Sequence, residues 1–212
     1  MNILGINAYH GDVSAVLVRD GQLIAAVEEE RFRRIKHIAG FPSEAILKCL
    51  EMGGVAPDAI DHLAISRRPH AHLLRKGLFA LTRRPSRGLV SDRAANYRRI
   101  EAIPGRLAEL LDLRSGQHRA RVHWVEHHPA HLASAFFVSP FDEAAVCAID
   151  GFGYFVSTSW AMGRGSSMDI LQRTWFPHSL GLLYLAITQY LGFVHYGDEF
   201  KVQCPTGSGQ YM

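Results

Sequence analysis

A mixed α/β fold is predicted for this 212-residue chain, chiefly from the order of elements in its first 66 residues. Three short runs, Ile3–Asn7, Val13–Val18 and Leu23–Val27, are apolar or β-branched, as strands are. Asp20-Gly21 separates the second run from the third, and this dipeptide is a strong signal for a two-residue hairpin turn. A helical pattern and another strand follow, so strand, hairpin, helix and strand succeed one another, which is a mixed α/β plan.

A helix is expected from Ser43 onward, because Ser43 follows Pro42 and a serine can cap a helix N-terminus. Gly53-Gly54 supplies a stop signal. The segment Ile60–Ser66 then returns as a strand. The apolar stripe of this helix consists of Ile46, Leu47 and Leu50.

The basic segment, residues 67–121, carries fourteen arginines and lysines and is expected to be mostly helical. Such a stretch can contact phosphates, nucleic acid or an anionic substrate. It can equally be a solvated helical insertion with ordinary surface arginines. No zinc-finger spacing and no aromatic RNA-binding motif accompanies the charge.

The second half of the chain is predicted to alternate again between strands and helices, and it weakly echoes the first half. Its order is a strand, a helix that carries histidines, three strands and a closing helix. These elements are expected at Val122–Val125, His127–Phe137, Ala144–Asp150, Phe155–Met162, Ile170–Trp175 and Leu180–Leu191.

Composition indicates a soluble globular protein, with 48% hydrophobic and 20% charged residues and a net charge of +3. No run of eighteen apolar residues and no basic start with an apolar block is found, so neither a membrane span nor a signal peptide is predicted. The three cysteines, Cys49, Cys147 and Cys204, are odd in number and widely spaced. Reduced thiols and a cytoplasmic location are therefore expected.

The sharpest chemical signal is the run Glu126-His-His-Pro-Ala-His131. His127 and His131 share one face of a helix and can grip one metal ion, with Pro129 in the first turn. His123 and His127 have the same spacing but are less suited, because Val122–Val125 is expected to be a strand. Asp150 ends an apolar strand beside Gly151, where it can supply a carboxylate ligand or cap a turn. Two imidazoles and a carboxylate with open positions suit a divalent metal such as iron(II).

Two further clusters are candidates for chemistry. In the loop after the first strand, His10 can act as a general base, since its pKa lies near neutrality, and Asp12 can orient a cationic or hydroxyl-bearing group. The alternative is a polar turn that satisfies itself. The acidic triplet Glu28–Glu30 leads into a basic cluster that includes Lys36, which suits phosphate or nucleotide contact or simply a solvated strand end.

Taken together, these segments resemble the NodU/CmcH family of carbamoyltransferases. The motifs that carry the resemblance are Ile3-Leu-Gly-Ile-Asn7, His10-Gly-Asp-Val-Ser-Ala15, Asp20-Gly21, Glu28-Glu-Glu-Arg-Phe32 with Lys36-His37, Phe41-Pro42, Glu126-His-His-Pro-Ala-His131, Asp150-Gly-Phe-Gly153, His178-Ser-Leu-Gly181, Gly192-Phe193 and Lys201-Val202.

The resemblance implies an actin/Hsp70/sugar-kinase-like (ribonuclease H-like) mixed sheet with flanking helices, related to the enzymes that make threonylcarbamoyladenosine in tRNA. It implies that His127, His131 and Asp150 bind the metal, that His10 and Asp12 lie near the acceptor hydroxyl, and that Glu28 and Lys36 help to hold the substrates. The donor would be carbamoyl-adenylate, made from carbamoyl phosphate and ATP by a YrdC-like domain. The acceptor would be a hydroxyl of a sugar, an antibiotic or a nodulation factor.

We expect one N-terminal lobe over residues 1–202, with the basic segment as a helical insert, and an irregular tail over residues 203–212 that marks a truncation. The family continues after Lys201-Val202 with a Gly-rich segment, whereas Gln203-Cys204-Pro205 stands here, and Tyr154 replaces the family's acidic residue. Without a second lobe the chain is not expected to complete the reaction alone. A tRNA-modifying relative and a non-catalytic binding module are the alternatives.

Overall fold

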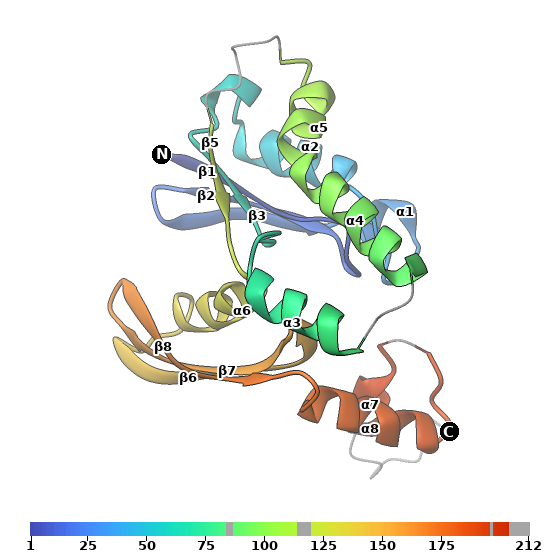
Figure 1. The fold of residues 1–212 in the computed structure, drawn as a ribbon. Coiled ribbons are helices and arrows are strands. Elements are labelled where there is room, and N and C mark those ends of the chain that lie inside the picture. Colours follow the sequence, from blue (N-terminus) through green and yellow to red (C-terminus); the bar gives the residue numbers. More distant parts are fainter. Residues whose placement is uncertain (84–86, 114–119, 196, 204–212) are drawn as a thin grey trace. The chain divides into compact units, whose positions relative to one another are not determined.

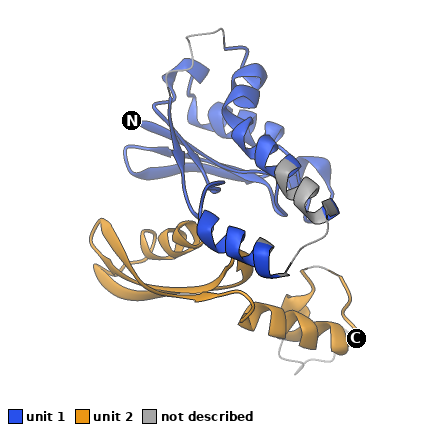
Figure 2. Cartoon of the chain, in the orientation of Figure 1, with its two compact units in different colours: residues 1–127 blue, residues 128–212 orange. Residues whose placement is uncertain are grey.

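The computed structural model describes residues 1–83, 87–113, 120–195 and 197–203, and they form two compact units (Figures 1 and 2). Unit 1 comprises Met1–His127 and unit 2 comprises His128–Met212. Of the predicted irregular tail over 203–212, Gln203 ends a helix (Glu199–Gln203), and residues 204–212 lie outside the described residues. The single lobe over 1–202 stays a prediction.

Unit 1 is built on a five-stranded mixed sheet with the order β3-β2-β1-β4-β5. β2 is antiparallel to β1 and β3, whereas β4 is parallel to β1 and to β5. This is the ribonuclease H-like strand order, so the predicted fold class is confirmed. The strands are β1 (Asn2–Asn7), β2 (Ser14–Arg19), β3 (Gln22–Glu28), β4 (His62–Ile65) and β5 (Arg121–Trp124).

Three helices of unit 1, α2, α4 and α5, pack on one face of this sheet (Figure 1). The core lies between them and the alternate strand positions that point inward, such as Leu4, Leu17 and Leu63, which are fully buried. The basic segment is helical as predicted. The helices are α1 (Glu30–Arg33), α2 (Ser43–Gly53), a 3-10 turn (Pro57–Ala59), α3 (Leu73–Arg83), α4 (Arg87–Glu101) and α5 (Ile103–Leu110).

The start of α2 is where the sequence predicts it, but the predicted cap is wrong. Ser43 makes no side-chain capping bond, and Pro42 occupies the cap position. Instead, the buried carboxylate of Glu29 accepts hydrogen bonds from the backbone N–H groups of Glu44 (3.4 Å) and Ala45 (2.9 Å). A full negative charge suits the free N–H groups and the positive dipole end of a helix better than a hydroxyl does.

Unit 2 is an antiparallel three-stranded meander, β6-β7-β8, with a small core under α6. Leu132 and Phe136 of α6 pack on Val146, Ala148 and Ala161 of the sheet. Among the described residues, none of the helices is long and apolar enough to cross a bilayer. The elements are α6 (His127–Phe136), β6 (Glu143–Gly153), β7 (Val156–Arg164), β8 (Ser167–Trp175), α7 (Leu180–Tyr190) and α8 (Glu199–Gln203).

Candidate metal centre

The first turn of α6 presents the two histidines that the sequence singles out. The helix begins at His127, so Pro129 lies in the first turn, where its missing N–H disrupts no helical hydrogen bond. His127 and His131 are four residues apart and share a helix face. His127 is half-buried and His131 is exposed.

His128 points into the protein and fixes the helix to the sheet. Its side chain is buried, and its Nε2 lies 2.9 Å from the carbonyl oxygen of Val156, which accepts the hydrogen bond. The bond ties the start of α6 to the start of β7. His128 is therefore a structural residue that orients the helix on which the two other histidines stand.

Asp150 lies at an irregularity in the β6–β7 ladder. Ile149 pairs with Thr158 and Gly153 pairs with Val156, so three residues of β6 stand opposite Ser157 alone. A bulge of this kind bends a strand and redirects a side chain, and bulges are common beside functional sites. One oxygen of the Asp150 carboxylate also accepts a 2.6 Å hydrogen bond from the N–H of Gly151. The bulge is what takes this carboxylate out of the regular alternation of the strand.

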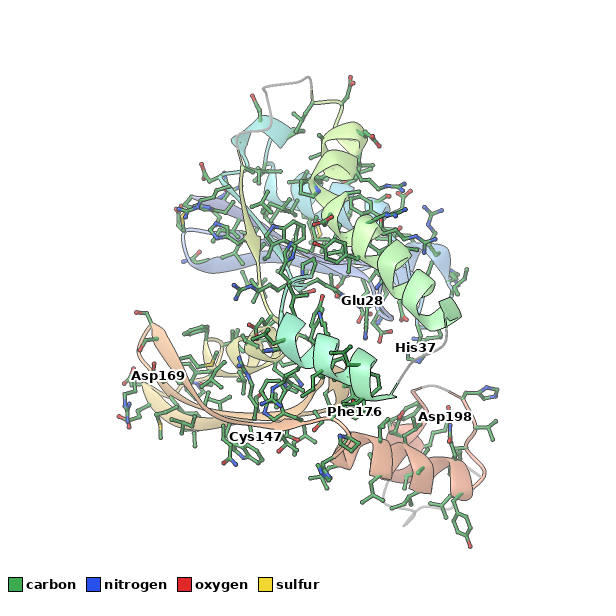
Figure 3. All side chains as sticks on the ribbon, in the orientation of Figure 1. Glu28, His37, Cys147, Asp169, Phe176 and Asp198 are labelled. Atoms are coloured by element: carbon green, nitrogen blue, oxygen red, sulfur yellow. The ribbon has the colours of Figure 1, made fainter. Side chains whose placement is uncertain are left out.

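The three side chains converge as the sequence predicts. One potential ligand atom from each of His127, His131 and Asp150 lies within 4.8 Å of the other two. Two atoms that each stand about 2.1 Å from an ion are separated by at most about 4.2 Å, so small side-chain rotations close the set. A shallow hollow of about 300 Å³ opens here, lined by His131, Cys147 and residues 148–150 (Figure 3 labels Cys147). The arrangement fits a divalent ion with further positions open to substrate.

Ser179 and Gly181 hold the backbone of Asp150, a role that the sequence analysis did not assign. The Ser179 hydroxyl donates to the carbonyls of Asp150 (3.1 Å) and Gly151 (2.8 Å) and accepts from the N–H of Leu182, which caps α7. A Cβ at Gly181 would lie 2.6 Å from the carbonyl carbon and oxygen of Asp150. The first turn of α7 thus packs directly on the backbone of the candidate ligand. The serine before a leucine-rich helix was the available signal.

His10 is the predicted catalytic residue whose ring lies beside that of His127. Its ring centroid is 5.9 Å from that of His127, with a 48° angle between the ring planes. The loop that carries it is fixed by backbone hydrogen bonds from Tyr9 to Gly40 (2.7 Å) and from Val13 to Ile38 (3.4 Å). One loop, at residues 38–40, therefore holds the backbone on both sides of His10.

The other predicted residues of unit 1 lie in paired contacts of their own. Asp12 contacts Nδ1 of His37 at 2.9 Å. Glu28 pairs with Arg31 (3.0 Å). Glu28 and His37 are both labelled in Figure 3.

Lys36 belongs to an ion pair with Glu30. Lys36 Nζ donates to the Glu30 carboxylate at 2.7 Å, and this bond holds the pKa of Glu30 below its ordinary value. Lys36 and Glu28 are 77% and 46% exposed, so both reach solvent, and they form ion pairs with Glu30 and Arg31 respectively.

His123 and His127, the alternative pair with the same spacing, lie in different secondary-structure elements. His123 lies on β5, outside the helix, and its Nε2 is 2.9 Å from Nδ1 of His62 on the adjacent strand. The expectation that His123 stands in a strand is therefore confirmed. Its imidazole contact is with His62 of the neighbouring strand.

Comparison with known proteins places the chain in a family. Residues 2–211 match the family described as carbamoyltransferase N-terminus. The chain belongs to this family. The match runs through the basic segment as well, which the motif resemblance had left out. The predicted membership of the NodU/CmcH-type carbamoyltransferases is confirmed.

Relatives extend well beyond this chain. An uncharacterised protein of Synechocystis is 40% identical over 220 residues, covering 100% of the chain and 35% of the relative. Nodulation protein NolNO of Sinorhizobium fredii is 37% identical over 197 residues, covering 92% of the chain and 27% of the relative. The chain thus spans about a third of the length of these relatives. Among solved structures, YeaZ from Pseudomonas aeruginosa is similar, with 17% identity, a TM-score of 0.42, and coverage of 84% of this chain and 69% of that one.

Proposed function

We propose that this chain forms the metal-binding and acceptor-binding part of an O-carbamoyltransferase. The donor is carbamoyl-adenylate, and the acceptor is a hydroxyl of a sugar, an antibiotic or a nodulation factor. The observation that carries the proposal is the convergence of His127, His131 and Asp150 within 4.8 Å, with the ring of His10 beside that of His127. Family membership supports carbamoyl transfer, and the nodulation protein among the relatives supports a nodulation-factor type of acceptor.

Iron(II) is the proposed metal, held by the two imidazoles and the carboxylate. Two nitrogen ligands and one oxygen ligand with open positions are typical of divalent iron sites. When bound, the ion would polarise the carbamoyl carbonyl or the adjacent phosphate of the donor. The hydrogen bonds from Ser179 and the close contact of Gly181 would keep the Asp150 carboxylate in place for this task.

His10 is the proposed general base. Its imidazole takes the proton from the acceptor hydroxyl as the oxygen forms a bond to the carbamoyl carbon. The bond between that carbon and the adenylate phosphate oxygen breaks, and AMP leaves with the electron pair. Asp12 fixes the position of His37 through their 2.9 Å contact, and these two side chains offer polar groups to the acceptor beside His10.

Glu28 and Lys36 are proposed to help hold acceptor and donor at the edge of the same site. Both are exposed at the end of β3 and in the loop that follows, so they are accessible to a ligand. The second lobe and a YrdC-like domain, which forms the adenylate from carbamoyl phosphate and ATP, would be supplied by sequence equivalent to the remaining two-thirds of the relatives.

Metal analysis tests the site. The purified chain is loaded with iron(II) under anaerobic conditions, and its metal content is compared with that of His127→Ala, His131→Ala and Asp150→Asn. We expect each variant to lose at least about tenfold in affinity, as loss of a ligand or of its support does. His123→Ala is the matched control, because it removes a histidine at the same spacing from His127. Metal content that is unchanged in the three variants, or lost only in His123→Ala, would contradict the assignment.

A chimera tests the transfer itself. The chain replaces the aligned N-terminal third of the Synechocystis relative, and mass spectrometry follows carbamoylation of hydroxyl acceptors. We expect His10→Ala to abolish transfer while the metal is retained, since the substitution removes the base and no ligand. A chimera that forms carbamoyl-adenylate and transfers equally well with and without His10 would show that another group takes the proton.

A further inference from the structure

Three parallel strands of unit 1 end at the same edge of the sheet and bring His10 and His127 there. β4 lies between β1 and β5 and runs parallel to both. The loop after β1 carries His10, and the chain after β5 leads through Glu126 to His127. Ligand sites in α/β proteins commonly form at the carboxyl ends of such strands. The residues that follow β4 start between these two stretches of chain and can reach both.

Arg67, the second residue after β4, supports the loop of His10. Its side chain is half-buried, and Nη2 donates a 3.3 Å hydrogen bond to the carbonyl oxygen of Tyr9, the residue directly before His10. Tyr9 has a φ of 57°, a left-handed conformation that a bulky residue keeps only when its surroundings hold it. The N–H of Tyr9 donates to the carbonyl of Gly40, and its side chain packs against the core. Arg67 adds a contact at the peptide that leads into His10.

Arg68, the next residue, contacts the end of the other neighbouring strand. Its Nη1 donates to Oε1 of Glu126 at 3.5 Å, and Nε2 of His72 lies 3.4 Å from Oε2 of the same carboxylate. Glu126 is 18% exposed and directly precedes His127. Arg68 is 57% exposed, so its ion pair alone is weak, but His72 is only 14% exposed. The segment after β4 therefore holds Glu126 from two positions.

We propose that Arg67 and Arg68 set the position of His10 relative to His127. Arg67 acts on His10 through the carbonyl of Tyr9, and Arg68 acts on His127 through the carboxylate of Glu126. Both are positioning residues, since each acts through a neighbour and supplies no ligand atom. The proposal rests on the proposed roles of His10 as general base and His127 as metal ligand.

The separation of the two imidazoles is the quantity that these contacts control. The ring centroids of His10 and His127 are 5.9 Å apart. A general base must come within about 2.6–3.2 Å of the group whose proton it takes. A displacement of about 1 Å can lower a rate by about 100-fold. The first residues of the basic segment would thus serve the reaction by fixing geometry, without binding an anion.

NMR spectroscopy of the metal-free 212-residue chain tests the proposal without any reaction. The imidazole C–H resonances are assigned with His10→Gln and His127→Gln, and the nuclear Overhauser effect between the two rings reports their proximity. We expect Arg67→Met to shift the His10 resonances and to weaken this effect, and Arg68→Met to shift the His127 resonances. Arg99→Met, which removes one of two consecutive exposed arginines on α4, is the matched control and is expected to change neither.

Cobalt(II) affinity and transfer separate the two arginines. Arg68→Met is expected to lower cobalt(II) affinity about tenfold, as loss of a supporting partner does. Arg67→Met is expected to leave this affinity unchanged, because His10 is not a proposed ligand. In the chimera with the Synechocystis relative, Arg67→Met should lower kcat about tenfold or more with little change in KM. Arg67→Lys, which keeps a cationic donor, should restore most of the kcat.

Glu126→Gln provides a second route to the same conclusion. If Arg68 acts through Glu126, Arg68→Met causes no further shift of the His127 resonances in the Glu126→Gln chain. Thermal unfolding shows which variants are folded, and this pair tests the proposal independently of Arg67.

Two results would overturn the proposal, whatever the transfer assay shows. One is an unchanged pair of imidazoles in both Arg67→Met and Arg68→Met, and the other is an equal change in Arg99→Met. Expected NMR shifts in a chain whose chimera transfers equally well with and without His10 would support the positioning role and contradict His10 as the base.

Discussion

Two hairpins of the molecule have the same type of turn, but one turn is formed by small or polar residues and the other by two aromatic residues. In unit 1, Arg19 pairs with Gln22, and the two residues between them, Asp20 and Gly21, have φ values of 51° and 82°. In unit 2, Gly153 pairs with Val156, and Tyr154 and Phe155 have φ values of 55° and 70°. Positive φ at both central residues is the mark of a type I′ turn, which Asp-Gly adopts readily and which a bulky aromatic pair adopts under steric strain.

Each hairpin also has a carboxylate in or directly after one of its strands, and the two carboxylates, Glu29 and Asp150, differ in their partners. Glu29, directly after β3, is 2% exposed, and its oxygens are used by the first N–H groups of α2 and by Arg33. Asp150, in the bulge of β6, is half-buried and faces two imidazoles. The hairpin of unit 1 has turn residues that favour positive φ, and the nearby carboxylate of Glu29 stabilises a helix, whereas the hairpin of unit 2 has two aromatic residues at positive φ close to the candidate ligand Asp150. Departures of this kind are typical of functional sites.

Removal of the Glu29 carboxylate is expected to have the largest effect on stability. Glu29→Ala leaves the buried N–H group of Ala45 and the part-buried N–H group of Glu44 without their acceptor, which costs about 2–4 kcal/mol of the free energy of unfolding. Urea unfolding measures the loss. Glu28→Ala, at an exposed neighbour, is the control and is expected to change stability by less than about 0.5 kcal/mol. Equal losses in the two variants would mean that Glu29 does not cap α2.

Gly181→Ala is expected to lower metal affinity by about 10–100-fold, because its Cβ would collide with backbone atoms of Asp150 that cannot rotate away. Isothermal titration with iron(II) or cobalt(II) measures the change. Gly151→Ala is the matched control: its Cβ would meet only Leu182 Cδ2 at 3.8 Å, an ordinary contact. If both variants bind metal as the unsubstituted chain does, the contact between α7 and Asp150 has no influence on the ligand.

Exchange of the first turn residues tests the hairpin comparison directly. Tyr154→Asn is expected to stabilise the protein by about 0.5–1 kcal/mol, because asparagine tolerates the left-handed conformation that tyrosine adopts under strain. Asp20→Tyr, the reciprocal change in unit 1, is expected to destabilise by about 1–2 kcal/mol. Thermal unfolding of the two variants gives the signs. The same sign at both positions would show that the turns are not equivalent.

The smallest expected effect concerns the pKa of Glu30. Lys36 stabilises the ionised carboxylate by a hydrogen bond and so lowers this pKa. Lys36→Gln should therefore let the pKa of Glu30 rise toward its ordinary value, as measured by NMR titration of the side-chain carboxyl carbon. With a lowered pKa, the contribution of the pair to stability is present above the ordinary glutamate range and is lost as the pH falls through the folded-state value. Lys48→Gln, which removes the pair with Glu51, should leave Glu30 unchanged.

The sequence predicts what local patterns determine. The hairpin at Asp20-Gly21, the helices of the basic segment and the placement of His127 and His131 one turn apart on a helix all follow from short-range rules, and all are observed. Contacts across the chain were not predictable from one sequence. The carboxylate of Glu29 lies 16 residues from Ala45, and Ser179 lies 29 residues from Asp150. The sequence predicts Phe155 as the start of a strand and does not predict the Tyr154-Phe155 turn, because neither residue favours positive φ.

The close contact between Gly181 and the backbone of Asp150 also bears on how the candidate metal centre folds. Its protein groups, from His127 to Gly181, lie within 55 consecutive residues, and they are joined by one helix and an antiparallel meander. Short closures of this kind give low contact order, which favours rapid folding. All the groups of this cluster therefore leave the ribosome as one stretch of nascent chain.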